Sequence, residues 1–476
     1  MSREHETAFE AWASPEEAGV SSAGLLRFLD AWEEIRSKVQ FHSMVLLRRG
    51  KVVCRMNFSP YDDVTPHTLF SLSKSFTSAA AGFAVSEGKI AWDSSVTDIL
   101  PEEIPEGREE ELRAVTLETL LSMGSGLDPA SDSPSPTPDV TWARHVLSHP
   151  LAHPPMTHFH YNTFGTYLVS CMVQKVTGQT VRDYLVPRLF QPLGIETPAW
   201  DLSPQGVCCG GFGLHLSAEG IARFGQCLLQ KGKWRGKQVL PEGWVDLATR
   251  EHIANYEGTR QEGNEWGQGY GFQFWRCMDG RYRGDGAMGQ ACIVDEKREA
   301  VLAVTCGTDD MGAEFQLIRE HLFPALDAPA GSDEDQTALQ ARIAALGYPF
   351  PADDVSDVPL PEGVFEAPFQ SIVCRISLQN ALLDQLRLTL HFSTADQVSF
   401  YFPRGRAGLA GMIPMNGMFV RFFGAYGWQK GKLHIALRSP DGPDTLDGAL
   451  TWTEDRLFFE GTGVNFPGGR VEFKKA

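Results

Sequence analysis

The chain has 476 residues, of which 42% are hydrophobic and 21% charged, a composition typical of a folded protein long enough for more than one domain. Its formal net charge of -18 argues against nucleic acid or an anionic membrane surface as a partner. All of that net negative charge lies before residue 360, which indicates two parts of different composition.

The N-terminal segment and the cysteines indicate the cellular compartment in which the protein is expected to reside. The sequence opens with a polar, acidic stretch that no apolar segment follows, so we expect no secretory signal, and no stretch is long enough to span a membrane. The nine cysteines are scattered, and no Cys-x-x-Cys pair occurs. These features favour a cytoplasmic protein with reduced thiols over a disulfide framework.

Residues 1–327 mix helical and strand patterns. Residues 21–36 have the spacing of a capped amphipathic helix, and residues 42–58 alternate as a β-hairpin. A Ser- and Ala-rich run predicts a buried helix over 71–86, and strands return as a second hairpin within 291–306. Further helical spacing occurs in four segments: 116–123, 164–176, 217–231 and 312–323. Strands at both ends with helices between them predict an α+β domain in which the two hairpins share one sheet.

The remainder of the chain is predicted to be a linker and a small all-β domain. Residues 328–361 combine linker composition, a short helix and a Pro- and Asp-rich stretch. Alternation dominates from residue 362 to 476, with turns expected at Asp441-Gly442 and Pro467-Gly468-Gly469. The alternating segments are 387–392, 433–437, 448–452 and 456–460. We therefore predict an all-β barrel or sandwich over 362–476.

The segment Ser71-Leu72-Ser73-Lys74 is the main candidate for catalysis. A serine hydroxyl is a weak nucleophile at neutral pH and needs a base beside it. A lysine becomes a usable base when burial lowers its pKa from about 10.4. The i to i+3 spacing places both side chains on one face of a helix, and unpaired N–H groups of the first turn can stabilise an oxyanion.

The same spacing occurs a second time, in Ser86-Glu87-Gly88-Lys89. That copy contains a glycine and falls at the predicted end of a helix, so we interpret it as a C-terminal turn. The first copy opens a run of small and apolar residues. On spacing alone, it is also compatible with a helix start that carries a solvated lysine.

The segment from Thr68 to Thr77 resembles the active-site segment of the serine β-lactamase and penicillin-binding-protein superfamily, in its class C and carboxylesterase-like branch. Other stretches follow in the order and spacing of that branch: Val115–Leu127, His158–Thr163, Val176-Thr177-Gly178 and Leu189–Ile195. The resemblance covers roughly residues 12–325. It implies a β-lactamase/transpeptidase-like fold, which is an antiparallel sheet flanked by helices with a helical subdomain, and no cofactor or metal.

The resemblance also implies roles around Tyr161. This residue would share the Ser71 proton with Lys74 and protonate the leaving group, provided that a neighbouring ammonium lowers the phenol pKa. The family usually has an asparagine two residues after this tyrosine. Here Thr163 occupies that position and Asn162 precedes it, and we expect both to bind substrate.

The third family element is a strand motif with a lysine or histidine two residues before a glycine. Gly284 stands at the cationic position, followed by Asp285 and Gly286, and the latter two are expected to contact substrate. The N–H of Ala287 would join the N–H of Ser71 in the oxyanion hole. Loss of the cation weakens the case for a carboxylate-bearing β-lactam substrate, because Arg283, an adjacent strand residue, points to the opposite face.

Other motifs carry weaker signals. Residues 284–289 match G-x-G-x-x-G, but a strand pattern follows instead of the helix that a dinucleotide-binding loop requires. Five histidines crowd residues 145–160, but prolines break any helix through them and no acidic residue lies among them, so we interpret them as loop histidines and expect no metal. The aromatic stretch 266–275 fits a strand core better than the wall of an acyl pocket.

Together these observations predict a serine hydrolase domain over 1–327, a linker over 328–361 and an all-β domain over 362–476. The enzyme would act through an acyl-enzyme on an ester, amide or β-lactam carbonyl of a small molecule, with Ser71, Lys74 and Tyr161 as catalytic residues. The alternative is a catalytically weak or inactive penicillin-binding-like protein that senses or binds a ligand, and the replacements at Thr163 and Gly284 motivate it.

Overall fold

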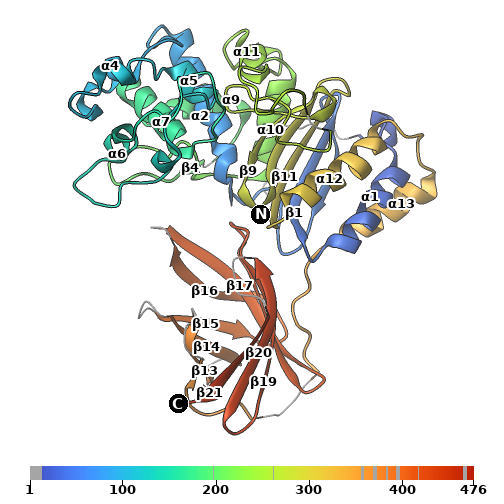
Figure 1. The fold of residues 1–476 in the computed structure, drawn as a ribbon. Helices are drawn as coiled ribbons and strands as arrows, with labels where there is room; N and C mark the ends of the chain where they lie inside the picture. The colour runs from blue at the N-terminus through green and yellow to red at the C-terminus, as the bar shows by residue number, and fades with distance from the viewer. Residues whose placement is uncertain are drawn as a thin grey trace. The chain divides into compact units, whose positions relative to one another are not determined.

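The computed structural model describes residues 13–196, 198–260, 262–354, 359–367, 373–381, 384–392, 397–415, 418–464 and 469–476. Contacts divide the chain into two compact units, and Figure 1 shows the elements of each. The second unit comprises Leu346–Ala476 with the short segments Asn57–Asp62 and Gly307–Asp309, and the first unit comprises the rest.

A six-stranded sheet forms the centre of the first unit. Its strands are β1 (Val39–Arg48), β2 (Lys51–Asn57), β8 (Trp275–Arg276), β9 (Tyr282–Gly286), β10 (Gln290–Asp295) and β11 (Ala300–Thr308), in the order β2-β1-β11-β10-β9-β8. The two predicted hairpins therefore share one sheet, as expected. β10 pairs antiparallel with both neighbours, and β10 and β11 are buried along their whole length, as strands are when helices cover both faces.

Helices cover this sheet on both sides. α1 (Ser22–Ile35), α12 (Met311–Leu317) and α13 (Asp333–Ala344) lie together on one side, while α10 (Ala218–Leu229) packs against β1 and β10 from the other (Figure 1). α13 falls inside the predicted linker, yet it packs on α1 and belongs to the first unit. A capping box that begins at Ser332 starts this helix, and its buried Leu339 explains why the segment folds onto the domain.

The helical subdomain is built around α2 (Ser73–Ser86), which is buried from Ser73 to Ala84. Its many small side chains let α7 (Thr163–Thr177) and β9 approach closely. The remaining helices of this unit are α3 (Val96–Ile99), α4 (Glu109–Leu112), α5 (Leu117–Leu121), α6 (Trp142–Ser148), α8 (Val181–Leu185), α9 (Gln191–Leu193) and α11 (Trp244–Thr249). Short strands complete it: β3 (His67–Thr68), β4 (Ala199–Trp200) and β5 (Leu214–Leu216) pair in the order β3-β5-β4, and β6 (Lys233–Trp234) pairs with β7 (Lys237–Gln238).

The second unit is a ten-stranded sheet that nearly closes into a barrel. Its strands are β12 (Phe365–Glu366), β13 (Val373–Ala381), β14 (Gln385–Phe392), β15 (Gln397–Pro403), β16 (Gly408–Met415), β17 (Met418–Gln429), β18 (Lys432–Arg438), β19 (Thr445–Trp452), β20 (Arg456–Val464) and β21 (Gly469–Lys475). They run in the order β15-β14-β13-β12-β21-β20-β19-β18-β17-β16, and the two end strands contact each other. Alternate residues fill a core of Leu, Ile, Phe and Trp side chains. The predicted all-β domain is therefore a near-barrel; Asp441-Gly442 lies between β18 and β19, while residues 465–468 lie outside the described residues.

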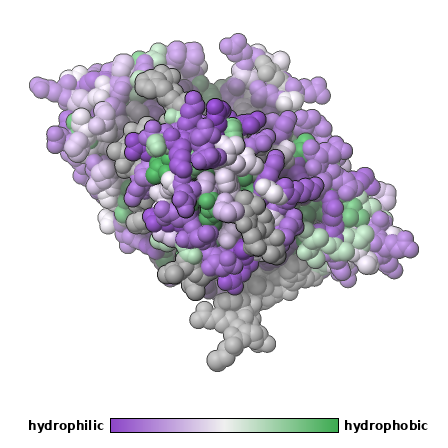
Figure 2. All heavy atoms as spheres, turned by 90° about the horizontal axis from the view of Figure 1, so that it is seen from below, coloured by the Kyte–Doolittle hydropathy of each residue, from purple (hydrophilic) through white to green (hydrophobic). Residues whose placement is uncertain are grey.

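The surface is largely polar. On the face drawn in Figure 2, hydrophilic side chains predominate and hydrophobic ones form small separate patches. Among the described residues, the exposed large apolar side chains are scattered, and Val64, Leu202, Leu409 and Met412 are the most exposed of them. Within the part of the chain that is described, no helix has the length and apolar character needed to cross a membrane.

Candidate active site

Ser71 lies in a tight 3-10 turn, Phe70–Leu72, that leads directly into α2. The hydroxyl of Ser73 holds this turn, because it donates to Phe70 O over 2.6 Å and accepts from Leu214 N over 3.0 Å. Phe70 adopts a left-handed φ of 45°, a conformation that costs a non-glycine residue about 1–3 kcal/mol and clusters at functional sites. The turn leaves Ser71 half-buried, so part of its surface reaches solvent.

Lys74 contacts the Ser71 side chain, as the i to i+3 spacing predicts. Its Nζ lies 2.9 Å from Ser71 Oγ, 2.8 Å from Gly211 O and 3.3 Å from Thr163 Oγ1. The lysine side chain is only 1% exposed. Burial lowers the pKa of Lys74 to about 7, and two nearby carboxylates oppose this effect only in part. At neutral pH, therefore, about half of the amine is uncharged.

Tyr161 is held beside these two residues by aromatic contacts. Its ring stacks on Trp275 at a centroid distance of 5.3 Å and meets Tyr270 edge to face at 6.3 Å. Lys74 Nζ lies 4.8 Å from the centre of the Tyr161 ring, and the Ser71 side chain is near enough to act on the Tyr161 pKa. The three residues singled out from the sequence therefore meet at one place.

The pKa of Tyr161 does not shift in the direction that the sequence argument required. Burial raises it above its ordinary value, and the charges of Asp285 and Asp132 raise it further. The expected lowering by an ammonium is outweighed because burial of the phenol has the largest effect on its pKa. Tyr161 is therefore protonated at neutral pH, which suits a proton donor and not a phenolate base.

Asn162 and Thr163 behave differently, although both were expected to bind substrate. Asn162 is 2% exposed and caps α7: its Oδ1 accepts from Gly165 N over 2.6 Å, and its Nδ2 donates to Ser131 Oγ over 2.8 Å. Because both polar atoms are bonded within the protein and the side chain is buried, Asn162 is held away from a ligand. Thr163 is half-buried and contacts Lys74, so of the two it alone lies beside the reacting groups.

The backbone of β9 packs directly on the Ser71 turn. A Cβ atom added at Gly284 would lie 2.6 Å from Leu72 Cδ1 and would overlap the Ser75 hydroxyl. A Cβ added at Gly286 would lie 3.1 Å from the backbone nitrogens of both Ser71 and Leu72. At Gly286 the added atom would meet backbone, so this position has no room for a side chain, whereas at Gly284 it would meet the ends of the Leu72 and Ser75 side chains. The two glycines let β9 pack closely on the Ser71 turn.

Ala287 follows Gly286 directly and is exposed. Its N–H and the N–H of Ser71 therefore belong to two backbone segments in direct contact, which is the arrangement that an oxyanion hole requires. The predicted hole is compatible with this geometry.

Asp285 is turned toward a buried ion pair. Its carboxylate accepts a hydrogen bond from Arg283 Nε over 2.9 Å, and it is 6% exposed. Arg283 is 1% exposed, lies 3.6 Å from Glu265 and stacks on Phe315. The expected substrate contact of Asp285 is therefore replaced by an internal one, and Arg283 is not available to a ligand's carboxylate, as its place on the strand indicates.

Two residues near the site escaped the sequence analysis, and Gln273 is the more deeply buried. Its backbone O accepts from Ser75 Oγ over 2.8 Å, and its Oε1 accepts from Thr166 Oγ1 over 3.0 Å. Its Nε2 donates to Leu120 O and Leu121 O over 3.2 and 2.8 Å. One glutamine thus joins α2, α7 and α5, two residues before the tryptophan that stacks on Tyr161. No local pattern marks it, since its partners are far apart in the sequence.

Asp132 is the second such residue. Its Oδ1 accepts from the backbone N–H groups of Thr163 and Phe164 over 2.7 and 3.0 Å, at the start of α7. In the sequence, Asp132 is marked only as an acidic residue in a loop rich in serine and proline, and this signal is too unspecific to identify a site residue.

We predict that Gln273→Met destabilises the first unit by about 2–4 kcal/mol, because the methionine fills the same space while two carbonyls and one hydroxyl lose buried partners. Urea unfolding followed by fluorescence measures this change. The exposed Gln316 serves as control, and Gln316→Met should change stability by less than about 0.5 kcal/mol. Equal effects of the two substitutions would contradict the joining role of Gln273.

No group of three or more potential metal ligands occurs among the described residues. The loop histidines instead contact one another, with His153 stacked on His158 at 3.8 Å and His145 edge to face with His149 at 4.8 Å. His153, His158 and His160 lie in loops as interpreted. The interpretation is wrong for His145, which lies within α6, and for His149, which caps its C-terminal end.

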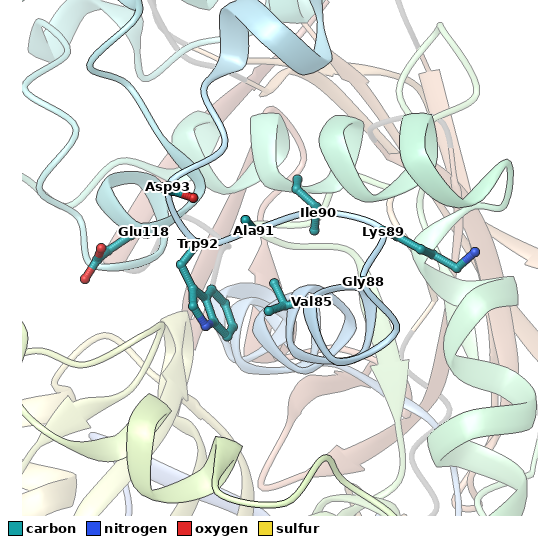
Figure 3. A pocket seen from close by; sticks show the side chains of 8 residues that line it. All are labelled: Val85, Gly88, Lys89, Ile90, Ala91, Trp92, Asp93 and Glu118. Atoms are coloured by element: carbon teal, nitrogen blue, oxygen red, sulfur yellow. The ribbon is translucent and has the colours of Figure 1, made fainter.

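An open cavity of about 650 Å³ lies at the opposite end of α2 from Ser71. Figure 3 shows its lining, in which Trp92 and Val85 face each other while Asp93 and Glu118 lie at one end. None of the candidate catalytic side chains lines this cavity. We therefore locate the active site by the contacts of Ser71 and not by this cavity.

Comparisons with known proteins identify the family. A family model described as Beta-lactamase matches residues 34–325. A 6-aminohexanoate-dimer hydrolase from Paenarthrobacter ureafaciens is 24% identical over 313 residues, which cover 61% of this chain and 78% of that protein.

Solved structures show the same fold. EstCE1, described as a hydrolase with promiscuous acyltransferase activity, superposes with a TM-score of 0.52 at 17% identity and covers 64% of this chain and 99% of its own. SurE superposes with a TM-score of 0.52 at 17% identity and covers 90% of this chain and 99% of its own. The second match therefore extends beyond the part of the chain that the family model covers.

Proposed function

This chain belongs to the Beta-lactamase family, and on that premise we propose that it is a serine hydrolase that works through an acyl-enzyme. The observation that supports this most directly is the 2.9 Å contact between Ser71 Oγ and the buried amine of Lys74, whose pKa burial lowers to about 7. A base with a pKa near the working pH is unprotonated in a sizeable fraction of the molecules and still binds a proton strongly enough to remove it from a hydroxyl.

Lys74 is the general base of acylation. In its uncharged form Nζ keeps two hydrogens, which Gly211 O and Thr163 Oγ1 accept, and directs its lone pair toward the Ser71 hydroxyl. Ser71 Oγ attacks the carbonyl carbon while its proton moves to Nζ. The N–H groups of Ser71 and Ala287 stabilise the oxyanion of the tetrahedral intermediate.

Tyr161 is the proton donor to the leaving group. When the tetrahedral intermediate collapses, the bond to the leaving group breaks and the phenol proton moves to the departing oxygen or nitrogen. The Lys74 ammonium returns a proton to the phenolate, which restores an uncharged amine beside the acyl-enzyme. That amine then takes a proton from water, which attacks the ester carbonyl. The acyl–oxygen bond breaks, and the Lys74 ammonium returns the proton to Ser71 Oγ, which restores the free enzyme.

We propose small-molecule esters and amides as substrates, in preference to β-lactams that carry a carboxylate. Gly284 stands where the family places a cation, and it carries no side chain that could pair with a carboxylate. The nearby Arg283 is paired with Asp285 and is 1% exposed. The names of two relatives, a 6-aminohexanoate-dimer hydrolase and a hydrolase with acyltransferase activity, support the same choice.

Intact-mass spectrometry with a fluorophosphonate tests the nucleophile. We expect one adduct per chain, which peptide mapping assigns to Ser71. A protein that stays unmodified while it remains folded would contradict the proposal and favour a binding protein without covalent chemistry. Benzylpenicillin serves as a second probe, and a stable penicilloyl adduct would overturn the preference for esters and amides.

A further inference from the structure

The carboxylate of Asp132 is fixed at the edge of the active site. It is exposed to solvent, and its Oδ1 is held by the N–H groups of Thr163 and Phe164. The hydroxyl of Thr163 lies 3.3 Å from Lys74 Nζ. A single residue therefore separates this carboxylate from the base that activates the nucleophile, and of the two acids that raise the Lys74 pKa Asp132 has the larger influence.

A capping role alone does not require the negative charge. The side chain of Asn162 already caps α7 through Gly165 N, and a neutral asparagine or serine at position 132 would accept the same N–H bonds. A carboxylate here opposes part of the pKa shift that makes Lys74 a base. Because the negative charge of Asp132 opposes the lowering of the Lys74 pKa and is not needed for the cap, we expect it to bind a ligand.

Of the described charged side chains that act on Lys74 and Tyr161, Asp132 is the one accessible to a ligand. Arg283 and Asp285 neutralise each other inside the protein and are 1% and 6% exposed. Lys74 is buried and about half uncharged. Among the described groups that act on Lys74 and Tyr161, Asp132 is therefore the exposed charge that faces solvent, and it is negative.

We propose that Asp132 selects substrates that carry an ammonium group near the scissile carbonyl, such as aminoacyl esters or amides and peptides with a free amino end. This inference rests on the proposed function, because it concerns the substrate of the same site. The ammonium pairs with the free Oδ2 side of the carboxylate while Oδ1 stays bound to α7. A carboxylate in the same place is repelled by Asp132 and finds Arg283 already occupied.

Asp132→Asn isolates the charge, since the amide oxygen still accepts the two N–H bonds. The substrates are the nitrophenyl esters of β-alanine and butyric acid, which differ only by an ammonium in place of a methyl group. We expect the ratio of kcat/KM for the β-alanyl ester to that for the butyryl ester to fall about tenfold or more in Asp132→Asn, mainly through KM. Rates are compared at pH 8, where Lys74 is mostly uncharged and the amine of β-alanine is still protonated.

Asp128→Asn is the matched control. Asp128 lies in the same loop and caps Ala130 N over 2.8 Å, but it is not among the charges that act on Lys74. We expect it to leave the ratio unchanged. A ratio that stays constant in Asp132→Asn, while both esters are hydrolysed, would overturn the ammonium proposal and leave the serine hydrolase intact. If the wild-type protein hydrolyses neither ester and takes no fluorophosphonate, both proposals fail.

A purely structural role of Asp132 would give a different result. Loss of its charge lowers the Lys74 pKa further, so the acid side of the pH–rate profile moves to lower pH by the same amount for both esters. A shift of this kind without a change in the ester ratio at pH 8 would show that Asp132 only tunes the base, which contradicts the inference.

Discussion

Ser71→Ala should reduce kcat for hydrolysis of a short-chain nitrophenyl ester by about 10⁴-fold or more, because the acyl-enzyme can no longer form. Removing a hydroxyl from this half-buried position leaves the 3-10 turn in place, since Ser73 holds it through Phe70 O and Leu214 N. Binding of substrate and its KM should therefore change little. The measurement is steady-state kinetics on the purified variant, with circular dichroism to confirm the fold.

The chain supplies its own control for this prediction. Ser86-Glu87-Gly88-Lys89 has the same spacing as Ser71–Lys74, but Ser86 ends α2 and its hydroxyl donates only to Phe83 O. We expect Ser86→Ala to keep wild-type activity within about twofold. If Ser86→Ala abolished hydrolysis and Ser71→Ala did not, our assignment of the nucleophile would be wrong.

Lys74→Met should reduce kcat by about 10³-fold or more, because methionine fills the buried space without a base. In the wild-type protein, kcat/KM should rise about tenfold per pH unit below pH 7 and level off above it, since only the uncharged amine accepts the Ser71 proton. The variant should lack this dependence on a group with a pKa of about 7. A wild-type profile that is flat between pH 5 and 8 would contradict the role of Lys74 as base.

The same substitution should make the protein more stable. The Lys74 pKa is lowered from 10.5 to about 7 on folding, so between these values the unfolded chain holds a proton that the folded protein has released. This proton favours unfolding, and the wild-type free energy of unfolding falls as pH drops from about 10.5 to 7 and is constant below. Lys74→Met removes the effect but leaves Gly211 O without its donor, for a net gain of about 2 kcal/mol at pH 7.

Denaturant unfolding at two pH values checks the sign. The advantage of Lys74→Met over wild type should be largest at pH 7 and shrink toward pH 10. An inactive variant that is less stable than wild type at both values would mean that the amine is not held uncharged by its burial. The combination of lost activity and increased stability is typical of a residue that serves chemistry at the expense of stability.

Much of the local structure followed from residue patterns. Alternation predicted both hairpins of the central sheet, and 3.6-residue spacing predicted α1, α2, α7 and α10 within a few residues of their ends. These patterns are reliable because the burial of one face of a helix or strand makes apolar residues recur at the period of that element. The contact of Ser71 with Lys74 could also be predicted from a local pattern, since a helix alone brings positions i and i+3 together.

The differences arose where the outcome depended on distant segments. The pattern could not tell that Asn162 caps its own helix while Thr163 faces Lys74, nor that α13 would fold back onto α1 within the predicted linker. It also could not reveal that Gln273 joins three helices. The contact of Thr163 with Lys74, the packing of α13 on α1 and the bonds of Gln273 each join segments that are far apart in the sequence. The Asn162 cap, in contrast, is a local bond to Gly165 that the sequence analysis missed.

The amino-acid sequence by itself determined the fold class, the two-part organisation and the pairing of a hydroxyl with an amine on one helix face, because these depend on short-range periodicity. Only the tertiary structure decided the protonation of that amine and of Tyr161, the close packing of β9 on the Ser71 turn, the pairing of Arg283 with Asp285 and the exposure of Asp132. The physical reason is that burial and electrostatic field are set by every segment that packs around a group, and no local pattern records them.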